Sequence, residues 1–216
     1  MPSNANATRQ RLVDAATRAF AEHGYAGASL LDITRRAGQR NRGAVHYHFG
    51  SREGMLAAVL EQHSDFLAER ELELLGRAQL RPADDLASVV EAIVRPCVEL
   101  AETGWQGRCY LVIVGELVEQ DLTTYAPEVP EALRRTGGYD VYALLTERLP
   151  PLPEDIRDER LALLTTFILR AVADRARAAE HPENARAQLG TEPFVRNLVA
   201  MATGMVAAPL PAAPGH

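Results

Sequence analysis

The chain has 216 residues, of which 47% are hydrophobic, so it can bury a substantial core in one large domain or two modest ones. The net charge of -6 excludes a protein that coats nucleic acid with its whole surface. No apolar run approaches the roughly 20 residues that a bilayer requires, and no signal peptide is evident, so we expect a cytoplasmic protein without a membrane partner. The two cysteines, Cys97 and Cys109, are too few for a disulfide framework; we expect buried reduced thiols, with a redox switch as the alternative.

Positive charge is concentrated near the amino terminus. Residues 1–56 hold eight arginines and four acidic residues, a net charge of +4, so the remainder of the chain carries -10. A compact basic module on an acidic body suits local DNA binding without a general attraction to nucleic acid.

The first fifty residues carry the signals of short helices. Residues 1–7 are polar, and we expect them to form a flexible arm. Apolar residues then recur at helical spacing after Thr8, the predicted N-cap, until the stop signal at Gly24. A second helix is predicted after Ser29, where Ser-Leu-Leu-Asp resembles a capping box, and it is expected to end at Gly38.

A third helix is predicted after this short turn, with Asn41 as its N-cap and Phe49 near its end. Its sequence is basic and aromatic. A helix, a short glycine-containing turn and a second helix form the organisation of a helix-turn-helix, whose second helix enters the DNA major groove.

This ordered series of motifs resembles the amino-terminal domain of TetR-type transcriptional regulators over residues 8–56. The resemblance rests on Ala19-Phe20, Gly24-Tyr25, Ser29–Ile33, Ala37-Gly38, Gly43–Phe49 and Ser51–Glu53. It implies a DNA-binding unit in which Tyr47 and His48 face DNA. The turn, residues 39–42, is one residue longer than the common family pattern.

Two groups of residues are predicted to contact DNA. The phosphate candidates carry hydroxyl, amide, imidazole or guanidinium groups and are Ser29, Arg40, Asn41, Arg42, Tyr47, His48 and Arg52. The base-edge candidates surround the start of the third helix and are Arg40, Arg42, Gly43, Ala44 and His46. Gly43 and Ala44 are small enough for close approach and contact with thymine methyl groups. His46 and His48 point about 200° apart on a helix, so we expect no shared metal ion.

A long fourth helix is predicted from its cap at Ser51 to the break at Arg81-Pro82, because apolar residues keep helical spacing over this range. A rigid helix of this length would transmit a movement of a second domain to the DNA-binding helices. His63 lies on its apolar face, where it is either a hydrogen-bonded core histidine or part of a pocket.

The rest of the chain is predicted to be helical, which gives an all-α fold with a larger helical effector and dimerisation domain. The predicted helices cover residues 84–100 with a kink at Pro96, 110–118, 131–149, 155–179 and 191–206, the last capped by Thr191. Residues 123–130 are expected to form a connection. The predicted domains are residues 1–52, 53–206 and a disordered tail, 207–216.

An effector pocket is predicted between residues 60 and 142, because aromatic residues with polar tips converge there with the Pro96 kink. The candidates are His63, Phe66, Cys97, Trp105, Tyr110, Tyr139 and Tyr142. The alternative is that each is a core residue. Since no arginine cluster occurs among them, we expect a neutral or weakly polar organic effector, and we expect no cofactor.

The family resemblance implies that the last two helices pair with those of a second copy. The residues expected at this homodimer interface are Leu164, Phe167, Ile168, Leu198 and Met201. The alternative is that they pack within one subunit.

The hypothesis is a dimeric, ligand-responsive transcriptional regulator, with repression preferred, whose partners are double-stranded operator DNA and a small organic effector. No nucleophile elbow, phosphate loop or zinc-protease helix occurs in the sequence. Two other hypotheses stay open: a helical enzyme or small-molecule carrier with a vestigial DNA-binding domain, and a constitutive DNA-binding scaffold without an effector.

Overall fold

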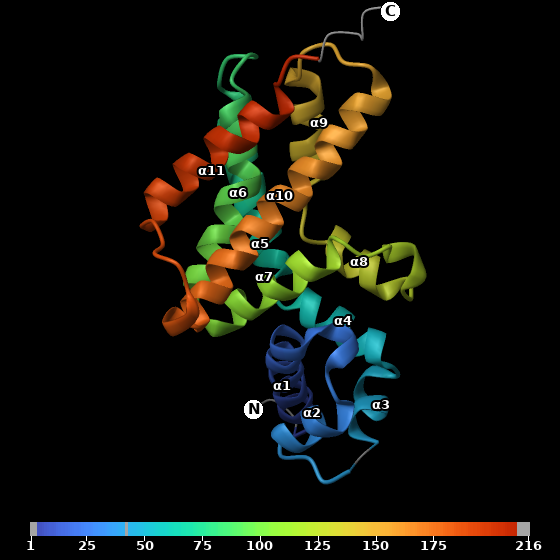
Figure 1. Ribbon diagram of the computed structural model, residues 1–216. Coiled ribbons are helices and arrows are strands. Elements are labelled where there is room, and N and C mark those ends of the chain that lie inside the picture. Colours follow the sequence, from blue (N-terminus) through green and yellow to red (C-terminus); the bar gives the residue numbers. More distant parts are fainter. Residues whose placement is uncertain (1–3, 42, 211–216) are drawn as a thin grey trace, which may run out of the picture.

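The protein folds into a small helical unit at the bottom of Figure 1 and a larger one above it. The computed structural model describes residues 4–41 and 43–210, and this part of the chain contains helices and no β-strand. The all-α fold, with a helix-turn-helix unit and a larger helical unit, is therefore confirmed. Among the described residues, no helix is both long and apolar enough to cross a membrane.

The helices follow one another with short connections. They are α1 (Asn4–Gly27), α2 (Leu30–Arg36), α3 (Ala44–Phe49), α4 (Arg52–Glu61), α5 (Ser64–Gln79), α6 (Leu86–Glu102), α7 (Trp105–Leu117), α8 (Glu128–Arg134), α9 (Tyr139–Arg148), α10 (Glu154–Glu180) and α11 (Thr191–Val206), with 3-10 helices η1 (Leu122–Thr124) and η2 (Pro182–Asn184).

The first helix begins earlier than predicted. It starts at Asn4 rather than after Thr8, so residues 4–7 are helical and not a flexible arm; alanines in this first turn favour helix. The prediction for residues 1–3 lies outside the described residues. Gly24 does interrupt the helix, because its φ of 71° and ψ of 160° are not helical.

The turn between α2 and α3 is built by local hydrogen bonds. The predicted cap is confirmed: the Ser29 hydroxyl accepts a bond from the Asp32 backbone N–H at 3.3 Å. Gly38, at φ 71°, closes the helix in a Schellman motif, in which its N–H donates to the Arg35 carbonyl at 3.0 Å. The prediction that Asn41 caps α3 is wrong. Its side chain accepts from the Gly43 N–H at 2.9 Å and stabilises the turn, and α3 starts at Ala44.

The predicted long fourth helix is wrong, because it is two helices with a joint at Gln62 and His63. Side chains at the joint are bound to neighbouring helices. The Gln62 amide donates to the Thr17 hydroxyl at 3.1 Å, and the His63 ring meets the Tyr110 ring edge-on at 5.1 Å. The Ser51 cap is confirmed, since its hydroxyl accepts from the Gly54 N–H at 2.9 Å.

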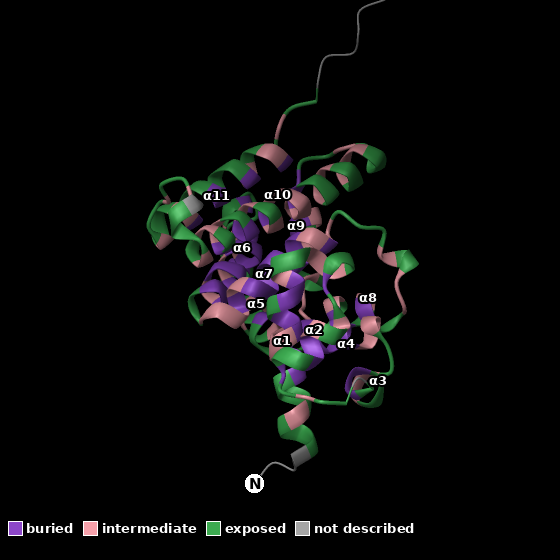
Figure 2. Ribbon diagram, turned by 60° about the horizontal axis from the view of Figure 1, so that its bottom comes forward, coloured by how far each residue is buried: buried purple, intermediate pink, exposed green. Residues whose placement is uncertain are grey.

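The larger unit is organised around α7, which packs against α10, α6 and α1. Figure 2 shows its buried residues between the surrounding helices. The contact of α7 with α10 is close at Gly115, where a Cβ atom would lie 2.6 Å from the Ala173 Cβ. Tyr110 is 2% exposed, and both free thiols, Cys97 and Cys109, are buried as predicted.

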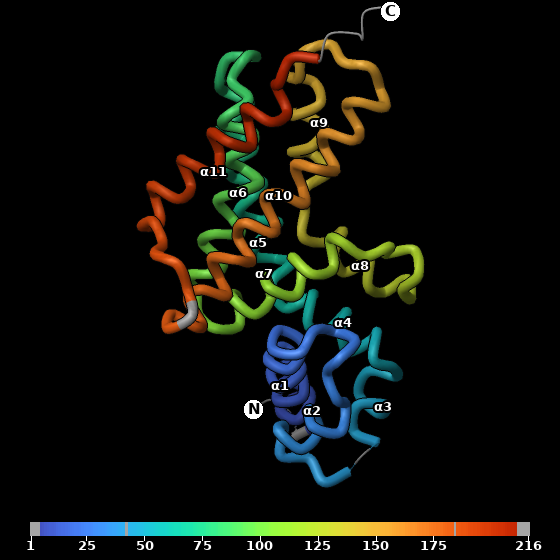
Figure 3. The backbone as a smooth tube through the Cα atoms, in the orientation of Figure 1, coloured from blue at the N-terminus to red at the C-terminus, as the bar shows by residue number. Residues whose placement is uncertain are grey.

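Three further predicted segments differ from the structure. The predicted helix 110–118 is α7, which begins five residues earlier, at Trp105. The predicted helix 131–149 is α8 and α9, separated because Gly137 and Gly138 have φ values of 98° and 93°. The expected connection, residues 123–130, contains the end of η1 and the start of α8. Figure 3 shows the chain running outward from α7 through this region and returning to α9.

The last two helices agree closely with the prediction. The bounds of α11 are those predicted, and α10 differs by one residue at each end. Thr191 is not the cap, which is Gly190; its hydroxyl instead donates to the Glu102 carboxylate. Pro96 lies inside α6, which continues on both sides of it. Of the tail predicted to be disordered, residues 207–216, the structure describes 207–210, where the Ala208 carbonyl accepts a hydrogen bond from Arg160 at 2.6 Å. Residues 211–216 lie outside the described residues.

Candidate nucleic-acid interface and effector cavity

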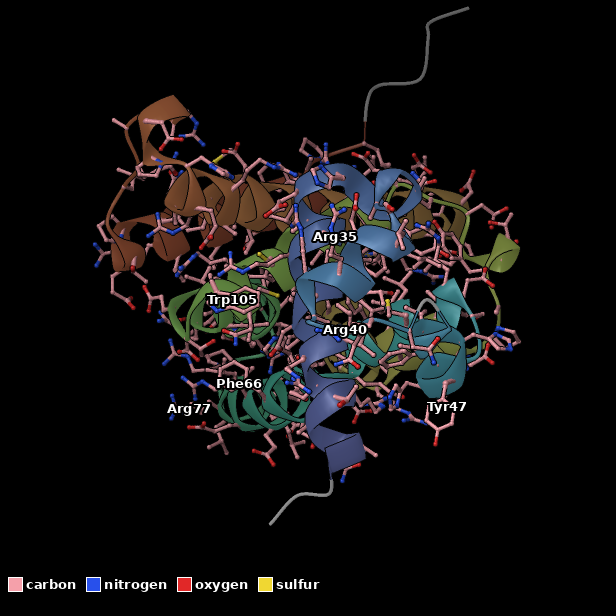
Figure 4. All side chains as sticks on the ribbon, turned by 90° about the horizontal axis from the view of Figure 1, so that it is seen from below. Arg35, Arg40, Tyr47, Phe66, Arg77 and Trp105 are labelled. Carbon is pink, nitrogen blue, oxygen red and sulfur yellow. The ribbon has the colours of Figure 1, made fainter. Side chains whose placement is uncertain are left out.

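The candidate DNA-binding face lies at the end of the small unit, on α3 and the turn before it. Tyr47 is 80% exposed. Arg40 is exposed and has no ion-pair partner in the described part of the chain. In the view from below, Figure 4, Arg35, Arg40 and Tyr47 all lie over this unit. The arrangement presents a guanidinium group and a phenol to solvent, as contact with a phosphate backbone requires.

The two histidines of α3 differ in their surroundings. His46 is exposed, and its Nδ1–H donates to the Gly50 carbonyl at 2.6 Å, which leaves Nε2 as an acceptor. His48 is half-buried and packs edge-on against Tyr47 at 4.9 Å. Gly43 is exposed at the start of α3, where it allows close approach of another molecule. These residues lie together with Arg40 and Asn41 on one end of the unit.

Three predicted DNA contacts have structural roles here. Ala44 is 6% exposed, so its methyl group packs in the core and is not presented to a base. Arg52 donates to the Tyr25 carbonyl at 2.7 Å and lies over the ring of the same tyrosine. The Ser29 hydroxyl caps α2. Arg42, the other arginine predicted to read a base, lies outside the described residues.

Sequence reasoning missed two further candidates, Arg35 and Arg36, at the end of α2. Their ion pairs are exposed, Arg35 with Asp32 at 2.9 Å and Arg36 with Glu22 at 2.8 Å. Exposed pairs of this kind contribute little to stability, so a phosphate group can replace the carboxylate. The sequence pattern that could have identified these two arginines as DNA contacts is their adjacent position directly before the turn.

The larger unit contains a cavity of about 250 Å³ with a predominantly apolar lining. The cavity is lined by α5, α6, α7, α9, α10 and the region between α7 and α9. The lining residues are Leu67, Glu71, Ile93, Cys97, Tyr110, Leu111, Val114, Leu117, Val118, Leu122, Leu133, Thr136, Gly137, Gly138, Tyr142, Thr165 and Leu169. The Tyr142 hydroxyl lies 2.6 Å from the Thr165 hydroxyl.

A larger groove of about 530 Å³ lies between α5 and α6, but its chemistry is different. It is lined by four arginines whose charges are matched by nearby carboxylates, as in the Arg81–Asp85 pair at 2.9 Å and the Arg95–Glu91 pair at 2.6 Å. We regard it as a solvated surface of paired charges.

The structure brings three of the predicted effector-site residues, Cys97, Tyr110 and Tyr142, to the apolar cavity. His63 packs against the Tyr110 ring without lining the cavity. The other three lie elsewhere, because their helices turn them away. Phe66 is 36% and Tyr139 is 65% exposed, and Trp105 is covered by the Arg18 guanidinium at 3.8 Å, at the contact of α7 with α1.

Glu71 is the cavity residue that sequence reasoning missed. Burial raises its pKa from 4.5 to about 7, although a hydrogen bond from the Gly138 backbone N–H opposes this shift. Its Oε2 is buried and has no hydrogen-bond partner in the described part of the chain. The sequence pattern that could have identified Glu71 is its position four residues after Leu67 and three before Leu74, on the buried face of α5.

The region between α7 and α9 connects this cavity to the DNA-binding unit. The Ala126 backbone N–H donates to the Glu53 carboxylate of α4 at 3.1 Å, and Arg135 pairs with Glu61 of α4 at 3.0 Å. The same region supplies Leu122 and Leu133 to the cavity lining. One segment therefore contacts both the cavity and α4.

Most of the predicted dimer residues are buried within the subunit. Leu164 and Ile168 are 0% exposed and Leu198 is 3% exposed, because they face the core formed by α6, α7, α10 and α11. Phe167 is half-buried. Of the five predicted residues, Met201 alone is exposed, at 52%. Leu163 of α10, which was not predicted, is exposed to 50%. The prediction was wrong about which faces of these helices are available.

Comparison with known proteins identifies both parts of the chain. Residues 12–59 match the family described as "Bacterial regulatory proteins, tetR family". Residues 91–205, more than half of the chain, match "Tetracyclin repressor-like, C-terminal domain".

Individual relatives agree with this assignment. The HTH-type transcriptional repressor AcnR of Corynebacterium glutamicum is 37% identical over 62 residues, 29% of this chain and 32% of that protein, so the match spans about a third of that relative. The regulator AcrR of Shigella flexneri is 28% identical over 169 residues, 74% of each chain. A crystal structure of FadR from Bacillus subtilis in complex with stearoyl-CoA has the same fold, with a TM-score of 0.55 and 15% identity over 92% of this chain and 97% of that one. The chain belongs to the TetR family of bacterial regulatory proteins.

Proposed function

We propose that the protein is a dimeric transcriptional repressor of the cytoplasm, released from operator DNA by a small organic molecule that binds the apolar cavity. The observation that carries this proposal is the double contact of residues 118–138, which line the cavity on one side and are bonded to α4 on the other. The repressor AcnR and the ligand-bound FadR support it as members of the same family. The family assignment also favours regulation over the alternative of a helical enzyme with a vestigial DNA-binding domain.

Two sets of contacts can carry the signal from the cavity to DNA. A ligand that displaces residues 118–138 moves the partners of Glu53 and Glu61 on α4. A ligand that shifts Tyr110 also moves His63, at the joint between α4 and α5. Either displacement releases DNA only to the extent that the ligand binds the DNA-free conformation more tightly than the DNA-bound one.

Dimerisation defines the expected operator. A two-fold dimer places two copies of α3 on successive major-groove faces, so we propose a roughly palindromic operator with half-sites one helical turn, or a multiple, apart. Within each half-site, Arg40, Gly43 and His46 are the base-edge candidates that the fold leaves exposed. Arg42, a fourth base-edge candidate from the sequence, lies outside the described residues.

The test begins with the selection of genomic fragments by the purified protein, followed by anisotropy measurements with a labelled fragment. The Arg40→Ala/Arg42→Ala double variant should weaken specific binding by about 1–3 kcal/mol for each arginine that reads a base. If the arginines contact only phosphates, affinity should fall on all sequences and its salt dependence should become shallower. Arg77→Ala, which removes an arginine of α5, is the matched control. Equal binding by wild type, double variant and control would reject this interface.

The alternative of a constitutive DNA-binding scaffold is tested separately. A compound that binds the folded protein raises its midpoint of thermal unfolding by mass action. Screening a library of apolar organic compounds by this shift, followed by measurement of operator release, distinguishes the two functions. A scaffold without an effector would keep its operator in the presence of every compound that stabilises it.

A further inference from the structure

The effector cavity contains a buried carboxyl group, that of Glu71, without a counter-ion among the described residues, and this feature identifies the class of ligand. We propose that the cavity selects a lipophilic cation, an organic molecule with an apolar body and one protonated amine or quaternary ammonium group placed against Glu71. The inference rests on the proposed function, because it concerns the ligand of the same cavity.

The position of the Glu71 carboxylate is fixed by the backbone beside it. A Cβ atom at Gly137 would lie 2.4 Å from Oε2, so the carboxylate is packed directly against this glycine. The Gly138 N–H provides one hydrogen bond, and Oε2 is left buried without a partner among the described residues. A buried ionised carboxylate without compensation is costly, so it favours a ligand that supplies positive charge.

In the part of the chain that the structure describes, no arginine forms an ion pair with this carboxylate. Arg70, its neighbour in sequence, pairs with Glu99 at 2.6 Å and with Glu73 instead. Arg135, near the cavity segment, pairs with Glu61. The residues that line the cavity include neither arginine nor histidine.

The other ionisable groups around the cavity are neutral near pH 7. Burial lowers the pKa of His63, which lies behind Tyr110, and so favours the uncharged imidazole. Burial raises the pKa of the Cys97 thiol to about 12 and raises the pKa of both Tyr110 and Tyr142. Glu71 is therefore the lining residue that can hold a charge, and the complementary charge has to come from the ligand.

The remainder of the lining suits the apolar part of such a ligand. Tyr110 and Tyr142 provide aromatic rings, whose faces attract organic cations, and most other lining residues are aliphatic. The sequence-based expectation of a neutral effector relied on the lack of arginines. That lack argues against an anion, whereas the buried carboxylate argues for a cation.

The test compares two probes of the same shape, phenyltrimethylammonium and tert-butylbenzene. The branching atom is a positively charged nitrogen in the first probe and a neutral carbon in the second. Binding is measured by calorimetry and by the thermal unfolding midpoint. Wild type should bind the cation about tenfold or more tightly than the hydrocarbon. Glu71→Gln keeps the side-chain shape and should remove most of this preference. Glu69→Gln, an exposed position two residues away on α5, should behave as wild type.

A second measurement needs no variant. Because burial raises the pKa of Glu71 to about 7, binding of the cation at pH 7 should release part of a proton, and binding of the hydrocarbon should release none. Calorimetry in two buffers of different ionisation enthalpy measures this release.

Each other outcome overturns the inference. Equal affinity of wild type for both probes, or an unchanged preference in Glu71→Gln, rejects the cationic ligand but leaves the cavity as an effector site. Binding of neither probe to wild type rejects the cavity itself, and with it the route by which the proposed function works. Cation binding without proton release shows that the charge lies away from Glu71.

Discussion

Glu71 should make the stability of the protein depend on pH. Its pKa is raised on folding from 4.5 to about 7, so the folded state binds the proton more tightly than the unfolded state. Stability is therefore expected to fall as pH rises through this range, with an upper limit of roughly 3–4 kcal/mol from this group. The stability of the Glu71→Gln variant should not decrease in this way with rising pH, so the variant should be more stable than wild type at pH 8. Chemical denaturation at a series of pH values measures the free energy of unfolding of both proteins. The same pH dependence in wild type and Glu71→Gln would contradict the raised pKa of Glu71.

At the scale of single residues, the caps could be predicted but the orientation of side chains could not. Ser29 and Ser51 bond to backbone groups three residues away, so their role is local and visible in sequence. The exposure of Ala44 and of Phe66 depends on what their helix face meets. Ala44 faces the core, whereas Phe66 is exposed to solvent. That choice depends on the packing of several helices, which sequence periodicity does not describe.

At the scale of elements, the bonds from α8 and the chain before it to α4 should govern release of DNA. We expect the Glu53→Ala/Arg135→Ala variant to bind an effector as wild type does but to release its operator less completely. The part-buried hydrogen bond from Ala126 to Glu53 and the exposed Arg135–Glu61 ion pair are together worth on the order of 1 kcal/mol, so the coupling should weaken by about two- to tenfold. Operator affinity is measured with and without saturating effector. Unchanged coupling would show that the signal passes only through Tyr110 and the joint at His63.

The close contact between α7 and α10 gives a second element-scale prediction. Gly115→Ala should destabilise the protein by about 1–3 kcal/mol, because the added methyl group would lie 2.6 Å from the Ala173 Cβ. Gly76→Ala is the matched control on α5, where nothing lies within 4 Å, and it should stabilise the protein by about 0.5–1 kcal/mol through helix propensity. Equal midpoints of urea denaturation for the two variants would contradict the close contact.

Elements bounded by strong local signals could be predicted, and elements bounded by tertiary contacts could not. Gly190 separates α10 from α11, and the bounds of α11 follow from sequence alone. The break between α4 and α5 falls at Gln62 and His63, neither of which is a helix breaker. Their contacts with Thr17 and Tyr110 accompany the break, and these partners are distant in the chain.

At the scale of the whole molecule, the outer surface of α10 and α11 is expected to form the dimer. Met201→Glu places a charge on this exposed surface and should weaken dimerisation by about tenfold or more, with a parallel loss of affinity for a palindromic operator. Leu72→Glu, at a position on α5 that is 64% exposed, should leave the dimer intact. Sedimentation at micromolar concentration separates the species. A monomeric wild type, or a fully dimeric Met201→Glu, would place the interface elsewhere.

The central claim is that occupation of the cavity controls DNA binding, and titration of the operator complex with a stabilising compound tests it most directly. The comparison includes Leu133→Phe, which reduces the cavity at a half-buried lining residue, and Phe66→Ala, which alters an exposed residue outside it. Operator release, followed by anisotropy, should require about tenfold more compound for Leu133→Phe and the wild-type concentration for Phe66→Ala. Release of the operator at the same concentration from all three proteins would contradict the account.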